Sequence, residues 1–218
     1  MIPENLSKIK DTLPGEVTLV AVSKTKPHTE IMEAYDAGHR IFGENKVQEM
    51  VAKWEALPKD IQWHMIGHLQ RNKVKYMAPF VHLVHGVDSL RLLKEIDKQA
   101  KKNHRRIDCL LQVHIAQEQT KFGFDERELL TVLQTTEFQE LSHVSVKGLM
   151  GMATFTHDTE QIRREFKTLK TTFEKVREQL PYVEILSMGM SGDYQIAIEE
   201  GSTMVRIGSR IFGKRNDV

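Results

Sequence analysis

Short apolar runs rich in β-branched residues alternate along this chain with longer segments in which apolar residues have helical spacing. The clearest helical spacing lies between residues 159 and 180, where it is set by Ile162, Phe166, Leu169, Phe173, Val176 and Leu180. A regular change between a period of two and a period of 3.6 is typical of βαβ units and predicts a parallel sheet.

Eight segments have the strand pattern: 17–23, 40–42, 61–66, 82–87, 107–115, 144–149, 183–186 and 203–207. Helices are predicted ahead of the first strand, up to Pro14-Gly15, and then near 28–37, 44–56, 70–77, 89–102, 125–134, 159–180 and 192–199. The count favours a single (β/α)8 barrel, a TIM barrel of the α/β class, although a doubly wound open sheet also fits the alternation. No linker or repeat interrupts the pattern, so we expect one domain over residues 1–218.

Composition narrows the function classes. The 218 residues are 40% hydrophobic and 28% charged, and the net charge is +1, so the overall charge gives no reason to expect nucleic acid or a membrane surface as partner. The single cysteine, Cys109, excludes an internal disulfide and lies in an apolar run, where we expect a buried strand cysteine. No segment resembles a signal peptide or a membrane span, so a cytoplasmic protein is expected.

Small residues follow the last two predicted strands. Segment 187–193 reads Ser-Met-Gly-Met-Ser-Gly-Asp and precedes a predicted helix, and Gly208-Ser209 follows the eighth strand. Such loops expose backbone N–H groups, and phosphates often bind after strands seven and eight of a barrel. Either loop alone is also explained as a helix cap or a turn. Their occurrence on adjacent strands favours a phosphate site.

Lys24 follows the first strand and shares the side of that strand with Val20 and Val22. Its amine can therefore reach the mouth of a barrel, where it could form an imine with an aldehyde. A solvated surface lysine is the alternative, and Lys26 has the same parity. Together with the phosphate loops, Lys24 predicts a bound phosphorylated aldehyde.

Arg206 lies within the apolar eighth strand, where an unpaired buried charge is costly. Two interpretations remain open on the residues alone. Arg206 either forms a structural ion pair, with Glu44 as one candidate, or it faces the ring nitrogen of pyridoxal phosphate.

Several blocks, in order from Val20 to Gly213, resemble the pyridoxal phosphate homeostasis protein family. They include Phe42-Gly-Glu-Asn45, Trp63-His-Met-Ile-Gly67, Leu186-Ser-Met-Gly-Met-Ser191 and Val205-Arg-Ile-Gly-Ser209. The resemblance implies a barrel like the N-terminal domain of alanine racemase, with pyridoxal 5'-phosphate (PLP) held as an imine on Lys24. It also implies that Arg206 faces the pyridine nitrogen, that Ser191, Gly208 and Ser209 hold the phosphate, and that Asn45 lies beside the ring.

Two positions depart from the family pattern: His114 stands where asparagine is common, and Lys46 stands where arginine is frequent. We expect His114 to be a satisfied core histidine. His64 and His68 lie near a strand end without a third ligand at metal spacing, so no metal is expected.

The resemblance favours a non-enzymatic carrier that buffers PLP and passes it to apo-enzymes, with effects on amino-acid and keto-acid balance. The printed chain ends soon after the eighth strand and shows no second acid/base residue, so we expect no catalytic residue and a monomer. The first alternative is a weakly active racemase-like enzyme that uses PLP. The second is a barrel that binds another phosphorylated metabolite, with Lys24 as an electrostatic contact.

Overall fold

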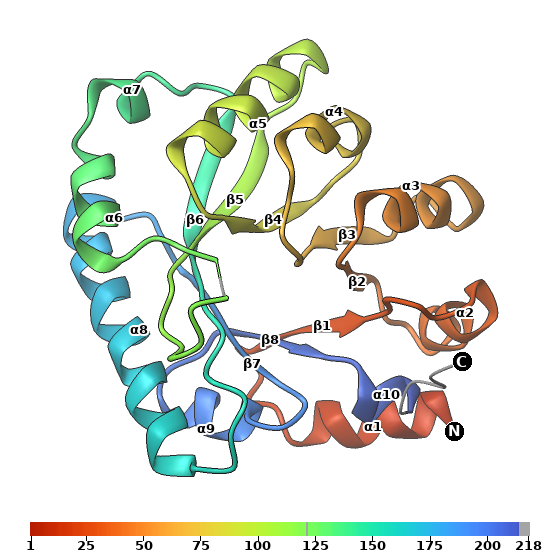
Figure 1. Cartoon of the computed structure of the whole chain (residues 1–218). Helices are drawn as coiled ribbons and strands as arrows, with labels where there is room; N and C mark the ends of the chain where they lie inside the picture. Colours follow the sequence, from red (N-terminus) through yellow and green to blue (C-terminus); the bar gives the residue numbers. More distant parts are fainter. Residues whose placement is uncertain (121, 214–218) are drawn as a thin grey trace.

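The protein is a closed barrel of eight parallel strands in sequence order, described here by a computed structural model for residues 1–120 and 122–213 (Figure 1). Residues 121 and 214–218 of the predicted domain 1–218 lie outside the described residues. The strands are β1 (Thr18–Val22), β2 (Ile41–Glu44), β3 (Gln62–Met65), β4 (Leu83–Val87), β5 (Ile107–Gln112), β6 (Val144–Met150), β7 (Ile185–Met190) and β8 (Met204–Ile207).

The barrel closes because the first and last strands pair with each other. Val20 of β1 lies opposite Arg206 of β8, and Ala21 lies opposite Ile207. A doubly wound sheet would leave two free edges, so this pairing excludes it and confirms the predicted (β/α)8 barrel.

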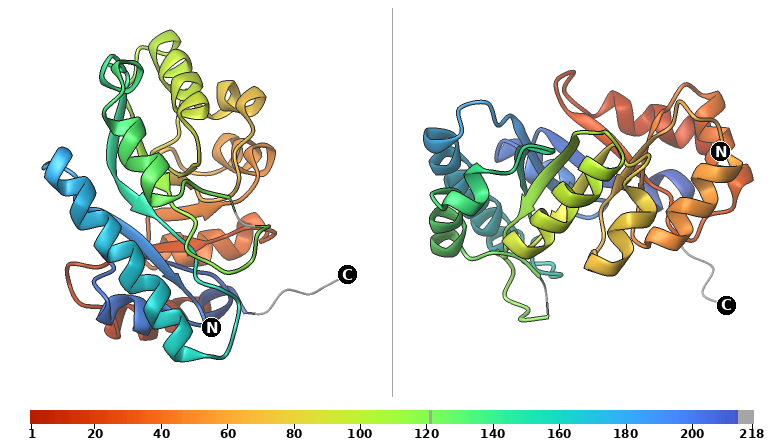
Figure 2. Two further views of the ribbon diagram at one scale, coloured as in Figure 1. Left: turned by 60° about the vertical axis from the view of Figure 1, so that its left-hand side comes forward. Right: turned by 90° about the horizontal axis from the view of Figure 1, so that it is seen from above.

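Helices pack around the outside of the strands (Figure 2). They are α1 (Ile2–Asp11), α2 (His28–Asp36), α3 (Val47–Ala56), α4 (Val74–Met77) after the 3₁₀ turn η1 (Arg71–Lys73), α5 (Leu90–Lys102), α6 (Glu126–Leu133), α7 (Thr136–Gln139), α8 (Thr159–Gln179), α9 (Tyr194–Glu199) and α10 (Ser209–Phe212). In α8 the periodic apolar residues from Ile162 to Val176 are buried, as their spacing predicts. Among the described helices, none combines the length and the apolar character needed to cross a bilayer.

Each strand separates two apolar layers. Val20, Leu83, Leu110, Met150 and Met204 form a small cluster inside the barrel, and a larger cluster lies between strands and helices. Because side chains alternate along a strand, the position of Val20 sets the inward side of β1. Lys24 and Arg206 share the inward parity of Val20 and Met204.

The predicted boundary of the seventh strand was wrong. β7 continues to Met190, so Ser187–Met190 of the expected phosphate loop is strand. Ser187 pairs with both neighbouring strands, and the register shifts between Ser187 and Met190. Gly189 at φ +104° forms this irregularity, and a Cβ there would press on Ala197 of α9. The short helices α7 and α10 were also not predicted.

Candidate functional site

A cavity of about 790 Å³ lies at the carboxyl ends of the strands. Its walls come from the ends of β1, β5, β7 and β8, from the loops after β1, β2, β3, β5, β6, β7 and β8, and from α8 and α10. The residues predicted from the sequence all line it: Lys24, Asn45, Ser191, Arg206, Gly208 and Ser209. The fold therefore brings together side chains that are up to 185 positions apart (Lys24 to Ser209).

Lys24 lies in a tight turn directly after β1. The Lys26 N–H donates to the Ser23 carbonyl at 3.1 Å, and Thr25 has φ +63°, which is unusual for a β-branched residue. The second candidate amine is already engaged, since Lys26 Nζ donates to the Phe212 carbonyl at 2.9 Å and lies 3.3 Å from Glu30 Oε2.

Arg206 is buried, with 3% of its surface exposed; its described hydrogen-bond partners are neutral, and the Asp193 carboxylate is a charged neighbour. It donates to Ser187 Oγ at 2.5 Å and to the Gly151 carbonyl at 3.3 Å. Burial lowers the pKa of Arg206 to about 10, so the guanidinium remains charged at neutral pH. The proposed ion pair with Glu44 is wrong, because Glu44 lies on the outward side of β2 and pairs with Lys53 at 2.6 Å.

Ser187 connects Arg206 to two buried histidines inside the barrel. Its Oγ lies 2.9 Å from His85 Nδ1, and His85 Nε2 lies 2.9 Å from His64 Nδ1. The Ser187 hydroxyl accepts from Arg206 and has a second lone pair and one hydrogen for His85, so the tautomer of each histidine sets the direction of the two remaining contacts. Burial lowers the pKa of His64 to about 3 and that of His85 well below its usual value. Both histidines are thus neutral, and the charge of this hydrogen-bonded chain is on Arg206.

The loops after β7 and β8 meet at the cavity. The Gly208 N–H donates to Ser191 Oγ at 3.3 Å, which joins the two loops. Within the described part of the chain, no hydrogen bond is present on the N–H groups of Gly192 and Ser209. Asp193, also on the wall, accepts from the Met190 N–H at 2.7 Å and stands at the start of α9. Two free N–H groups, two hydroxyls and nearby cations are a donor set that suits a phosphate ester.

His68 is a wall residue that the sequence reasoning did not select. Its Nδ1 lies 3.4 Å from Asp88 Oδ2, and its ring stacks on Phe122 at 3.7 Å between centroids. The sequence held one signal for it: His68 follows β3 with the parity of Ile66, which also lines the cavity. His64, in contrast, belongs to the buried hydrogen-bonded chain.

His114 is only half-buried, and its Nε2 is enclosed without a hydrogen-bond partner among the described residues. The expectation of a satisfied core histidine was therefore wrong.

Cys109 is buried in β5, as predicted. In the described residues no cluster of three or more histidine, cysteine or acidic side chains could hold a metal.

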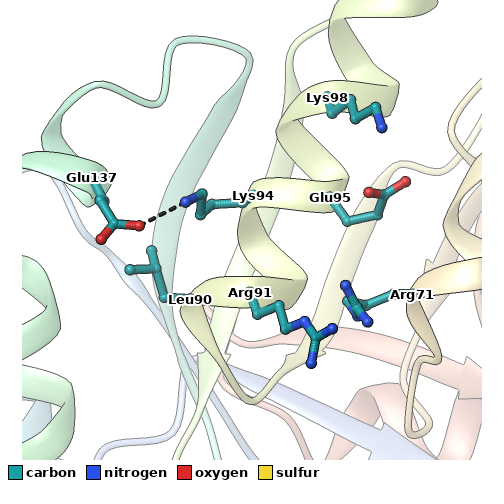
Figure 3. A pocket seen from close by; sticks show the side chains of 7 residues that line it. All are labelled: Arg71, Leu90, Arg91, Lys94, Glu95, Lys98 and Glu137. Carbon is teal, nitrogen blue, oxygen red and sulfur yellow. Dashed lines mark hydrogen bonds and ion pairs between the residues drawn. The ribbon is translucent and has the colours of Figure 1, made fainter.

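A second cavity, of about 540 Å³, lies outside the barrel beside α5 (Figure 3). Basic side chains surround it, among them Arg71, Arg91 and Lys98, and Lys94 is paired with Glu137 at 2.6 Å. None of the predicted site residues lines this cavity.

Comparison with known proteins places the chain in a family. The sequence matches the alanine racemase N-terminal domain family over residues 1–216. It is 42% identical to the pyridoxal phosphate homeostasis protein of Aquifex aeolicus, over 90% of this chain and 86% of the relative. The chain belongs to the pyridoxal phosphate homeostasis proteins.

Solved structures of the family have the same barrel. PipY of Synechococcus elongatus without PLP superposes with a TM-score of 0.93 at 36% identity, over 98% of this chain and all of PipY. PipY with PLP bound superposes with a TM-score of 0.89 over the same shares of both chains.

The buried histidines predict a loss of stability in acid. An unfolded histidine titrates near pH 6.5, whereas the pKa of folded His64 is about 3, so between these values only the unfolded chain binds the proton. Stability then falls by about 1.4 kcal/mol per pH unit for each such histidine as the pH decreases.

His64→Asn keeps a side chain that can donate to or accept from His85 and removes this titration, so its urea-unfolding free energy should decline less than that of the wild type between pH 7 and pH 5. The exposed His28 offers the control, because His28→Asn should keep the wild-type pH dependence. Identical pH profiles for the wild type and His64→Asn would contradict the assignment.

Proposed function

We propose that this protein binds PLP reversibly in the barrel-mouth cavity and acts as a carrier and buffer of the cofactor in vitamin B6 homeostasis. The observation that supports this best is the convergence of all six sequence-predicted residues on one cavity. Family membership and the PLP-bound relative PipY support the same ligand.

Each group of the ligand has a matching wall residue. The Lys24 amine attaches the aldehyde, Arg206 faces the pyridine nitrogen, and Asn45 lies beside the ring. Ser191, Gly208 and Ser209 bind the phosphate, assisted by the free Gly192 N–H. Bound PLP supplies a reactive aldehyde and a ring that can accept electrons.

Arg206 favours the carrier over an enzyme. A permanent cation against the pyridine nitrogen disfavours protonation of that nitrogen, and the described hydrogen-bond partners of Arg206 are neutral. An unprotonated ring withdraws electrons weakly, so the bound aldehyde is protected without strong activation of an amino acid. We place this monomeric carrier in the cytoplasm, in transient contact with PLP-dependent apo-enzymes.

One observation favours the second candidate, a weakly active racemase-like enzyme. Asp88 beside His68 Nδ1 can fix the tautomer that leaves Nε2 for proton transfer, and His68 shares the cavity with Lys24. The chain thus offers a second acid/base residue that the sequence analysis did not identify.

Attachment is tested by reduction. Borohydride should fix PLP covalently to Lys24, because Lys24 follows β1 with the inward parity of Val20 and lines the cavity. Peptide mass mapping should locate the label. Lys26→Ala should be labelled like the wild type, and Lys24→Ala should not. A label on Lys26, with full covalent binding in Lys24→Ala, would overturn the assignment.

The phosphate loops are tested with a charge. A Cβ at Gly192 meets no atom within 4 Å, so Gly192→Asp adds a carboxylate with little steric change. Since each charge-assisted hydrogen bond contributes roughly 1.5–3 kcal/mol, Gly192→Asp should weaken PLP binding at least tenfold in equilibrium titration. Gly192→Asn is the neutral control and should bind nearly normally.

Pyridoxal without the phosphate should bind far more weakly than PLP to the wild type, and equal affinities would show that these loops are only turns.

Carrier and enzyme are separated by exchange at the amino-acid α-carbon. For the carrier, deuterium exchange of alanine should stay near the rate given by free PLP, while the loaded protein restores activity to an apo-enzyme. Each factor of ten in rate is about 1.4 kcal/mol of barrier, so an enzyme would exceed free PLP by several decades. Rapid exchange lost in both Lys24→Ala and His68→Ala, without cofactor transfer, would favour the racemase-like alternative.

A further inference from the structure

The turn that carries Lys24 is held from behind by a buried cluster of charged residues. Lys53 of α3 is 3% exposed and Glu44 of β2 is fully buried. Lys53 Nζ donates to three oxygens: Glu44 Oε1 at 2.6 Å, Glu49 Oε1 at 2.7 Å and the Ser23 carbonyl at 2.7 Å. All three hydrogens of the ammonium group are therefore used within the protein.

The cluster holds both peptide groups that flank Lys24. On one side, Lys53 binds the Ser23 carbonyl, and Ser23 Oγ donates to Glu44 Oε1 at 2.6 Å. On the other side, the Thr25 N–H donates to Glu49 Oε1 at 2.5 Å. With the peptide planes before and after Lys24 both held, the direction of its Cα–Cβ bond is set.

Thr25 shows that this arrangement needs support. A β-branched residue at φ +63° is strained unless the surroundings stabilise it, and Thr25 is exposed. The described contact of its N–H is with Glu49, and Lys53 holds Glu49 in turn. The strain therefore lies directly beside the proposed attachment site.

The cluster also stands apart from the cavity. Ser23 and Glu44 have the outward parity of Ala21 and Phe42, which pack in the layer between strands and helices. Glu44, Glu49 and Lys53 do not line the cavity. An effect of these residues on the ligand must act through the turn.

We infer that Glu49 and Lys53 are positioning residues that hold the Ser23–Thr25 turn so that the Lys24 amine is directed at the ligand aldehyde. This inference rests on the proposed function and adds to it: covalent capture depends on a cluster behind β1 that does not contact the ligand.

The test separates capture from binding. Pyridoxine 5'-phosphate carries an alcohol in place of the aldehyde, so it uses the same ring and phosphate contacts but cannot attach to an amine. In Glu49→Ala, borohydride trapping of PLP on Lys24 should slow by about tenfold to a hundredfold, because small misplacements of a reacting group carry penalties of that size. The affinity for pyridoxine 5'-phosphate should stay within about twofold of wild type. Glu49→Gln keeps an acceptor for the Thr25 N–H and should restore most of the trapping rate.

Glu55→Ala is the matched control, because it removes an exposed glutamate of the same helix α3 and leaves the turn contacts intact. It should trap PLP at the wild-type rate. If Glu49→Ala fails to fold, the double variant Glu49→Ala with Thr25→Gly replaces it, since glycine adopts this φ without strain. Wild-type trapping in Glu49→Ala, or an equal loss of trapping and of pyridoxine 5'-phosphate binding, would overturn the inference. Failure of the wild type to bind PLP would instead contradict the proposed function.

Discussion

Pairing between the first and the last strand is the constraint on which the site depends. Val20 opposite Arg206 closes the barrel and fixes the register of β1 against β8. That register places the end of β1, with Lys24, beside the end of β8, with Gly208 and Ser209. The Lys24 amine and the Gly208-Ser209 loop, from the two ends of the chain, then share one cavity, and the cavity exists only in the closed barrel.

Charge is distributed differently on the two sides of the strands. Inside, Arg206 donates to neutral groups, and burial keeps the histidines of the hydrogen-bonded chain uncharged. Outside, Lys53 is paired with Glu44 and Glu49 in the layer under α3. Burial raises the pKa of Glu44 to about 7, although Lys53 opposes this effect. Glu44 and Glu49 thus lie on the outer side, and Arg206 at the cavity keeps neutral hydrogen-bond partners with the Asp193 carboxylate nearby, which suits a ligand with a basic ring nitrogen.

The strands and most helices were predictable because each buries one face, and that requirement imposes a period on the residues. The predictions failed where local spacing was not the deciding factor. β7 extends through Ser187 and Gly189 because both neighbours pair with it, although these small residues read locally as a loop. Glu44 was considered as a partner of Arg206 because both are charges in apolar strands. Glu44 and Arg206 cannot pair because they lie on opposite sides of the barrel wall, and strand register sets these sides.

The sequence by itself determined the barrel class, the reactive lysine candidate and the small-residue loops, because periodicity, backbone freedom and side-chain chemistry are local properties. The resemblance to the family motifs then predicted PLP as the ligand. Only the tertiary structure decided that Lys53 supports the Lys24 turn, that Ser187 joins Arg206 to His85 and His64, and that His68 meets Asp88 on the cavity wall. Each of these contacts joins different strands, the loops after different strands, or such a loop and a helix. The distances between these residues are set by barrel closure and helix packing, which cannot be predicted from a local pattern of residues.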